Sequence, residues 1–214
     1  MVEECVTTRL RPRDRIAGAA RDLFHRHGIR GIGVDAIAEA AGTNKMTLYR
    51  HFGSKDDLII QCLRDVALEA EAWWAEMESD HPGDPMAQLR AWIAGCAECL
   101  FGDDRGCDLA NAAVELAESD HPARRVIEGI KTEQRDRLAK LCRKAGVVQA
   151  DLLADTLSLL LEGARMSRQS VGVEGPSGKF VSMCEAIVAS FQNPSSEEKR
   201  TPARAAMAES AMRI

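Results

Sequence analysis

The chain has 214 residues and a formal net charge of −5, with 28 Lys and Arg residues against 33 Asp and Glu residues. This balance excludes a protein that coats nucleic acid with a uniformly basic surface. Hydrophobic residues make up 45% of the chain and aromatic residues only 4%, which favours a globular helical protein over a β-sandwich or barrel. Because no apolar run approaches the roughly 18 residues of a membrane span and no leader-like start is present, we expect a cytoplasmic protein with no membrane partner.

Apolar residues recur at helical spacing in about nine segments, so the predicted fold class is all-α. The segments are approximately 12–27, 34–41, 43–52, 54–80, 84–101, 107–118, 120–144, 151–169 and 177–192. Gly28, Gly42 and Gly146 mark helix ends, and Ser54 opens an S-x-x-D capping box. The first three segments form a small unit, and the others form a larger bundle.

Residues 34–52 contain the parts of a helix-turn-helix: a bracing helix, a turn with Gly42, and a second helix that would enter the DNA major groove. The second helix has no carboxylate. Its polar or cationic side chains are Lys45, Thr47, Tyr49, Arg50 and His51, whereas Met46, Leu48 and Phe52 are expected to pack inward. Lys55 stands in the first turn of the following helix, where a cation opposes the helix dipole unless an anion such as phosphate is nearby.

The run IRGIGVDAIAEAAGTNKMTLYRHFGSKDDLI resembles the N-terminal signature of the TetR/AcrR family of bacterial transcriptional repressors, most specifically in TLYRHFGSKDDL. The resemblance implies a three-helix DNA-binding head, a connecting fourth helix, and a helical domain that dimerises and binds an inducer. The DNA contacts that it implies are Thr43, Asn44, Lys45, Thr47, Tyr49, Arg50, His51 and Lys55. Lys45 and Thr47 would read bases or backbone, and Tyr49, His51 and Lys55 would contact phosphate. Gly33 and Met46 depart from the family pattern, so the base preference cannot be transferred.

The charge is unevenly distributed along the chain. Residues 1–53 hold nine basic and six acidic residues, a net +3, which leaves −8 for the remainder. We therefore expect a DNA-binding head over 1–53 with a flexible N-terminal arm at 1–11, a ligand-binding and dimerisation domain over 54–193, and a disordered tail at 194–214. Arg9, Arg11 and Arg13 form either a minor-groove arm or a disordered basic tail.

The last two predicted helices, 151–169 and 177–192, have apolar surfaces wider than one core-facing stripe needs. We expect them to pair in a homodimer, and the alternative is a deeply buried monomer core. An inducer pocket for an apolar or aromatic molecule is expected on the middle helices. Its candidate residues are Trp73, Trp74, Met77, Trp92, Cys96, Leu100 and Phe101.

The seven cysteines are scattered, which suits reduced thiols rather than a disulfide framework. Cys96 and Cys99 lack a local fourth ligand for zinc, so no metal and no other cofactor is expected. Cys107 follows Arg105 closely and remains open as a redox-sensing or electrophile-sensing thiol, because a neighbouring cation favours the thiolate.

The predicted function is a regulator, most simply a repressor, that binds a palindromic operator in double-stranded DNA as a homodimer and is released by a small molecule. The alternatives are a thiol sensor on the same scaffold, a nucleoid-type DNA binder and a helical enzyme. An enzyme is not expected, since no catalytic motif is present. The Asp-His-Pro triplets at 80–82 and 120–122 are explained as an Asp N-cap followed by Pro.

Overall fold

The computed structural model describes residues 10–102, 105–116 and 120–192. Within these ranges the chain forms nine α-helices, one 3-10 turn and no strand, which confirms the all-α class. The helices are α1 (Pro12–His27), α2 (Val34–Ala40), α3 (Lys45–Phe52), α4 (Lys55–Asp80), α5 (Pro85–Gly102), α6 (Asp108–Glu115), α7 (Pro122–Lys144), α8 (Ala150–Val171) and α9 (Phe180–Gln192), with the 3-10 turn η1 at Pro176–Lys179. Apart from residues 10 and 11, the predicted arm (1–11) and the predicted tail (194–214) lie outside the described residues.

Local signals determine where the first helices begin and end. The backbone N–H of Gly28 donates to Phe24 and ends α1, as predicted. Gly42 adopts a φ of +61° in the turn between α2 and α3, a conformation that favours glycine. The side chains of Asn44 and Ser54 accept hydrogen bonds from the backbone N–H groups of Thr47 and Asp57, so each caps the helix that follows it.

Four predictions about helix ends are wrong. The N-cap of α7 is His121 rather than Asp120, because the His121 Nδ1 atom accepts from the Ala123 N–H at 3.2 Å. Asp80 is the last residue of α4 and caps no helix start. The segment predicted from residue 177 opens with the turn η1, in which the buried Ser177 hydroxyl donates to the Gly172 carbonyl. The sixth helix, predicted to reach residue 118, already ends at Glu115.

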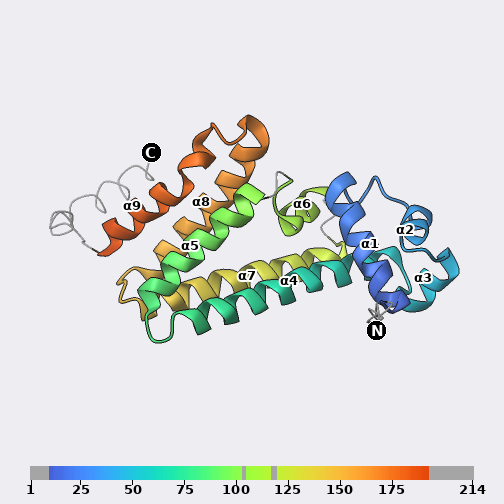
Figure 1. Ribbon diagram of the computed structural model, residues 1–214, viewed down its shortest axis with the longest axis horizontal. Helices are drawn as coiled ribbons and strands as arrows, with labels where there is room; N and C mark the ends of the chain where they lie inside the picture. The colour runs from blue at the N-terminus through green and yellow to red at the C-terminus, as the bar shows by residue number, and fades with distance from the viewer. Residues whose placement is uncertain (1–9, 103–104, 117–119, 193–214) are drawn as a thin grey trace, which may run out of the picture.

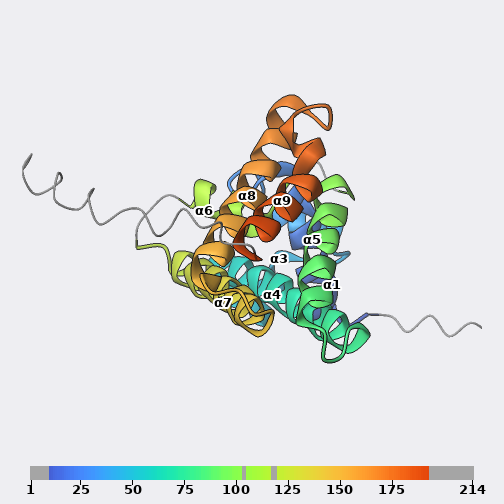
Figure 2. The same cartoon turned by 90° about the vertical axis from the view of Figure 1, so that its left-hand side faces the viewer.

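The molecule is elongated, with the head at one end and the bundle at the other (Figure 1). The two long helices α4 and α7 pack side by side along the molecule. Helices α5, α8 and α9 complete the bundle, which Figure 2 shows from the end opposite the head. No helix in the described ranges is both long and apolar enough to cross a membrane.

Three separate hydrophobic cores lie along the molecule, and α4 contributes to each of them. The head core contains Ile16, Ala20, Ile37, Ala38, Ala41, Leu48, Phe52, Leu58 and Cys62. The junction core contains Ile29, Ile59, Leu63, Leu109, Ala112, Leu116, Ala123 and Ile127. The body core is the largest and includes Trp74 and Met77 of α4. The packing of the head therefore extends past Gly53 into the first turns of α4.

Candidate nucleic-acid interface and ligand cavity

Helix α3 buries one face in the head and presents the other outward. Leu48 is fully buried and Phe52 is 7% exposed, whereas Lys45, Tyr49 and Arg50 lie at the surface. Helices α2 and α3 lie at the end of the molecule farthest from α9 (Figure 1), where the body does not obstruct them. The first turn of α3 is therefore accessible to a DNA groove.

Met46 does not pack inward as predicted. Its side chain is 80% exposed in the first turn of α3, between Lys45 and the half-buried Thr47. Exposing a large apolar side chain at this position suits contact with an apolar group of DNA, such as the thymine methyl. The helical period accounts for the exposure, because Met46 points away from the buried Leu48.

Several predicted DNA contacts already have partners within the head. The Lys45 ammonium lies 3.3 Å from a carboxylate oxygen of Asp35, in an exposed pair. The Asn44 side-chain oxygen is used in the α3 cap, and Thr43 is half-buried in the turn. Arg50 is exposed on the outer face. Lys45 and Arg50 are thus the cations of α3 that are best placed for DNA.

His51 and Lys55 point inward, which differs from the phosphate contacts that the family resemblance implies. The His51 Nε2 atom is buried without a hydrogen-bond partner. The Lys55 ammonium donates to the Ile29 carbonyl at 2.7 Å and lies 5.8 Å from the centre of the Phe24 ring. Burial lowers the pKa of Lys55 from its ordinary value. In this DNA-free structure Lys55 braces the loop after α1, and its phosphate contact remains a prediction.

Arg13 belongs to α1 and not to an arm. Its guanidinium donates to the Gln61 side chain at 2.7 Å and lies 5.1 Å from the centre of the Phe52 ring. Arg11 is the N-cap residue of the same helix, and Arg9 lies outside the described residues. A minor-groove arm that includes Arg13 is therefore incompatible with this packing.

A cavity of about 550 Å³ lies in the body, lined mainly by α4, α5, α7 and α8. Four of the seven predicted pocket residues line it: Trp73, Trp74, Trp92 and Cys96. Met77 and Leu100 are buried in the body core but are not among the lining residues, and Phe101 is partly exposed under the guanidinium of Arg168. The tryptophans that line the cavity thus come from the two helices α4 and α5.

Gly95 of α5 makes room for one wall of this cavity. A Cβ atom at Gly95 would lie 2.4 Å from the Cζ2 atom of Trp73, closer than any real contact. The Trp73 indole can therefore rest against the α5 backbone, with its ring centre 5.8 Å from that of Trp74. The edge-to-face arrangement of these two rings is typical of packed aromatic pairs.

The cavity also contains charged side chains that the sequence analysis missed. The Lys131 ammonium lies 2.5 Å from the Glu162 Oε1 atom, and the Arg165 guanidinium lies 3.1 Å from the same oxygen. A signal was present in the sequence, because Glu162 and Arg165 interrupt the most apolar segment of the chain, LLLEGARM. Charges at such positions are paired or face a cavity.

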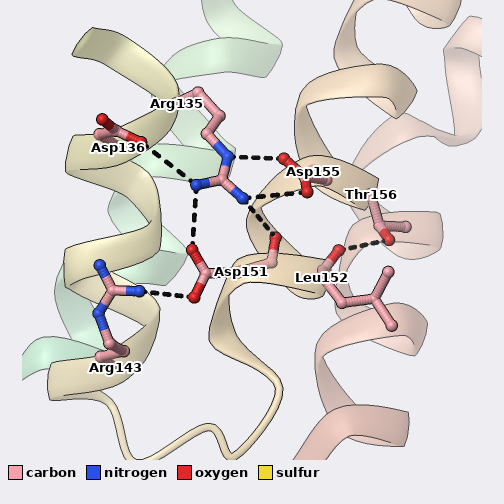
Figure 3. Close-up of polar contacts among 7 residues, drawn as sticks. All are labelled: Arg135, Asp136, Arg143, Asp151, Leu152, Asp155 and Thr156. Carbon is pink, nitrogen blue, oxygen red and sulfur yellow. Dashed lines mark hydrogen bonds and ion pairs between the residues drawn. The ribbon is translucent and has the colours of Figure 1, made fainter. Parts of the chain in front are cut away.

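Arg135 fastens α7 to α8 at the edge of the cavity (Figure 3). Its guanidinium bonds to Asp155 at 2.6 Å, to Asp151 at 3.0 Å and to Asp136 at 3.2 Å. The pKa of Asp155 is lowered by the hydrogen bond from Arg135, and that of Asp151 by the hydrogen bond from Arg143 first and then by Arg135. This network ties Arg135 to the protein rather than to a ligand.

The cysteines differ in environment. Burial raises the pKa of the thiols of Cys62, Cys96 and Cys184 to about 12 and that of Cys142 to about 11, so these thiols are protonated at neutral pH. Cys107 instead lines the cavity, and the Lys131 ammonium lies 3.7 Å from its sulfur atom. The described residues contain no group of three or more His, Cys, Asp or Glu side chains that would hold a metal ion.

Helix α8 carries an exposed stripe with an alternating pattern. Leu152, Leu159 and Met166 are 54%, 74% and 61% exposed, whereas their neighbours Leu153, Leu157 and Leu161 are buried. The alternative that the whole apolar surface of this segment is buried in a monomer core is therefore wrong. The small residues Thr156 and Gly163 lie between these large residues, and Ser170 follows Met166, all on the same stripe at spacings of three and four.

Helix α6 connects the cavity to the head. Cys107 at its N-cap and Leu109 in its first turn line the cavity, and Asp108 between them bonds to His25 of α1 at 2.5 Å. At the other end of α6, Glu115 accepts a hydrogen bond from the backbone N–H of Arg30. The head thus contacts the body through α6 as well as through α4.

Comparisons of the sequence with known proteins agree with this architecture. A sequence profile described as bacterial regulatory proteins, tetR family, matches residues 16–62. RaaS of Mycobacterium tuberculosis, an HTH-type transcriptional regulatory protein, is 42% identical over 76 residues, which are 35% of this chain and 35% of RaaS, so that match spans little more than a third of the relative. AcrR of Shigella flexneri, an HTH-type transcriptional regulator, is 24% identical over 157 residues, which cover 71% of this chain and 73% of AcrR.

Solved structures share the whole fold. A TetR-family transcriptional regulator from Streptomyces coelicolor superposes with a TM-score of 0.78 at 26% identity, covering 84% of this chain and 95% of the other. A tetR-type regulator from Streptomyces avermitilis superposes with a TM-score of 0.72 at 28% identity, covering 86% and 99%. Head and body together therefore define a DNA-binding transcriptional regulator of the helix-turn-helix class. The head carries the sequence signature of the tetR family, and the chain has the fold of TetR-family regulators.

Proposed function

We propose that this regulator is a ligand-responsive repressor that binds a palindromic operator as a homodimer and leaves it when a small molecule occupies the cavity. The observation that carries the proposal is the combination, in one chain, of an outward-facing recognition helix, a cavity of about 550 Å³ and an exposed stripe of large apolar and small residues on α8. Each of these parts has a separate task in such a repressor.

The recognition helix supplies the DNA contacts. Lys45, Met46 and Thr47 in the first turn of α3 are suited to reading base edges, because N-terminal residues of a recognition helix reach deepest into the major groove. Tyr49 and Arg50 one turn later are suited to phosphate. Substitution of Lys45 is expected to alter sequence preference, whereas substitution of Arg50 is expected to weaken binding to all sequences alike.

The homodimer would form through α8 together with α9, which correspond to the predicted pairing segments 151–169 and 177–192. Large side chains alternate with small ones along the α8 stripe, so two copies related by a two-fold axis can interdigitate. The hydroxyls of Thr156 and Ser170 donate to carbonyls of their own helix at 2.7 and 2.8 Å and need no outside partner. A monomer in sedimentation equilibrium at micromolar concentration would contradict this pairing.

The two heads would be coupled to the cavity through α4 and α6. Helix α4 packs in all three cores, so a ligand that shifts it relative to α7 also shifts the head. Helix α6 adds a polar connection through Asp108 and Glu115. A ligand with different affinities for the two arrangements would change the spacing of the heads and with it the fit to the operator.

Selection of bound oligonucleotides with the purified full-length protein tests the function. We expect an enriched inverted repeat with half-sites about one helical turn apart. Enrichment of a single asymmetric site would contradict the dimeric mode. Binding that depends only on DNA length, with no enriched sequence, would favour a nucleoid-type binder instead.

One observation favours a second candidate function, that of a thiol or electrophile sensor. The Cys107 sulfur lies in the cavity 3.7 Å from the Lys131 ammonium, and a nearby cation stabilises the reactive thiolate. On this account peroxide or an electrophile would release the protein from DNA in a gel-shift assay, and Cys107→Ser would abolish the response. An unchanged response in Cys107→Ser would rule it out.

A further inference from the structure

The lining of the cavity combines two kinds of side chain. The apolar ones include the tryptophans of α4 and α5, with Leu138 and Leu161. The charged ones are Glu69, Lys131, Arg135, Glu162 and Arg165. An occupant that suits both kinds has an apolar or aromatic body and a polar or charged end.

The pairing of the five charged side chains leaves one positive charge without a counterpart. Glu69 is bonded to Arg21 of the head, and Arg135 is held by Asp155, Asp151 and Asp136. The charges of Glu69 and Arg135 are therefore balanced by side chains that do not line the cavity.

Lys131 and Arg165 share a single carboxylate. Both approach the Oε1 atom of Glu162, at 2.5 and 3.1 Å. A guanidinium has five N–H donors and an ammonium three, so most donors of both side chains are not used by Glu162. Two cations beside one carboxylate make this end of the cavity a site for a further anion.

We propose that the cavity binds molecules with an apolar or aromatic body and one acidic group, whose carboxylate lies between Lys131 and Arg165. This ligand class rests on the proposed ligand-responsive function. The side chains of Lys131 and Arg165 are only 32% and 22% exposed, so an ion pair there is screened less than on an open surface. A cationic ligand would meet two like charges, and a neutral one would leave the excess charge unbalanced.

The Cys107 sulfur near Lys131 is the competing explanation for the extra charge. A thiolate at Cys107 would balance Lys131 and remove the need for an acidic ligand. The variant Cys107→Ser distinguishes the two, because it removes any thiolate but leaves Lys131 and Arg165 in place.

The tryptophans provide a direct readout. The chain has three Trp residues, and all of them, Trp73, Trp74 and Trp92, line the cavity. Intrinsic fluorescence of the full-length protein therefore reports on the cavity. The probes are octanoic and decanoic acid with their primary amides, which do not absorb near tryptophan, and 1-naphthoic acid with 1-naphthamide by calorimetry.

We expect the acids to bind about tenfold more tightly than the matched amides, since a hydrogen bond between charged partners replaces a neutral one. Arg165→Gln and, as a second variant, Lys131→Gln should each weaken the acids about tenfold and leave the amides unchanged. Glu162→Gln should tighten the acids, because it removes the competing carboxylate, and Cys107→Ser should change nothing.

Amides that bind as tightly as acids would overturn the ligand class, and so would failure of every acid to bind. Acid binding that tightens in Cys107→Ser would overturn it too, because a thiolate would then balance Lys131 in the wild type. Circular dichroism checks that each variant retains its helices. Affinity for the selected DNA, measured separately, distinguishes this result from failure of the proposed function. Acids that bind but do not alter DNA affinity would leave the ligand class intact and contradict the ligand-responsive repressor.

Discussion

The head and the body of this regulator are built in different ways. The head is a small unit of three helices and the start of α4, and its outward face is one short helix with accessible side chains. The body is a larger bundle with a net negative sequence, a cavity inside it and an exposed stripe on α8. The head therefore presents its functional groups directly, whereas the body creates its sites only by packing several helices together.

The proposed coupling between the two regions depends on how they are joined. The head core includes no residue of the body helices α5, α8 and α9. The junction core and the bonds of Asp108 and Glu115 join the head to the body. Variants that act on one region alone test the division between them.

The largest effect is expected from breaking the stripe on α8. Met166→Asp places a charge in the proposed dimer interface, where it has no partner and is costly to bury. We expect a monomer in sedimentation equilibrium and a roughly hundredfold or greater loss of operator affinity, although the head is unchanged.

Val148→Asp is the matched control for this variant. Val148 is 89% exposed and precedes α8, which begins at Ala150, so the same substitution outside that helix should leave a dimer that binds DNA normally. A dimeric Met166→Asp protein with full DNA affinity would show that the body pairs through another surface.

The second-largest effect is expected from a substitution that fills the cavity and leaves the head unchanged. Gly95→Val brings side-chain atoms against Trp73 and should cost about 1–3 kcal/mol of folding free energy through overpacking. We expect weaker binding of cavity ligands by tryptophan fluorescence and unchanged affinity for the selected DNA. Gly129→Ala of α7, where a Cβ atom meets nothing within 4 Å, is the control. If Gly95→Val weakened DNA binding as much as it weakened ligand binding, the DNA affinity of the head would depend on the packing of Trp73 against Gly95.

A smaller effect concerns the head alone. If Met46 contacts a thymine methyl, replacing that thymine by uracil removes only the methyl group and should weaken wild-type binding about two- to fivefold. Met46→Ala should bind the thymine and uracil operators equally, as measured by fluorescence anisotropy. A uracil effect of the same size in both proteins would assign the methyl contact to another side chain.

The smallest effect is expected from breaking the ion pairs of Arg135 with Asp151 and Asp155 on the body surface. Asp151 and Asp155 have lowered pKa values, so their pairing stabilises the fold above their unfolded pKa of about 4 and is lost as the pH falls through the lowered values. Arg135→Gln should lower the urea midpoint of unfolding slightly at pH 7. The difference in midpoint between variant and wild type should shrink below about pH 4. Lys140→Gln on the same helix is the control. A difference that persists at low pH would show that Arg135 acts through packing instead.

Most of the head was predictable because its signals are local. Gly28, Gly42, Asn44 and Ser54 end or cap helices through contacts within a few residues, and such contacts are encoded in short segments. The exposure of Met46 was not predicted, because an apolar residue was assumed to pack. The direction of the Lys55 side chain depends on the loop after α1, which is distant in sequence.

The sequence predicted the tryptophans of the cavity but not its charged side chains. Tryptophans on middle helices indicated an apolar pocket, but the polar end needs Lys131 of α7 to meet Glu162 and Arg165 of α8. No local pattern specifies that meeting, since it follows from the packing of α7 on α8. The capping of α7 by His121 was missed for a different reason: the contact is local, but a histidine takes the place expected for an aspartate.

The most direct test of the account is the affinity for a selected operator, measured by fluorescence anisotropy with the cavity empty and with it saturated. Tryptophan fluorescence of the same samples establishes the occupancy, since all three Trp residues line the cavity. We expect the occupied protein to bind the operator about 5- to 150-fold more weakly, the usual range of coupling between two sites. Unchanged operator affinity at full occupancy would contradict the claim that the body controls the head.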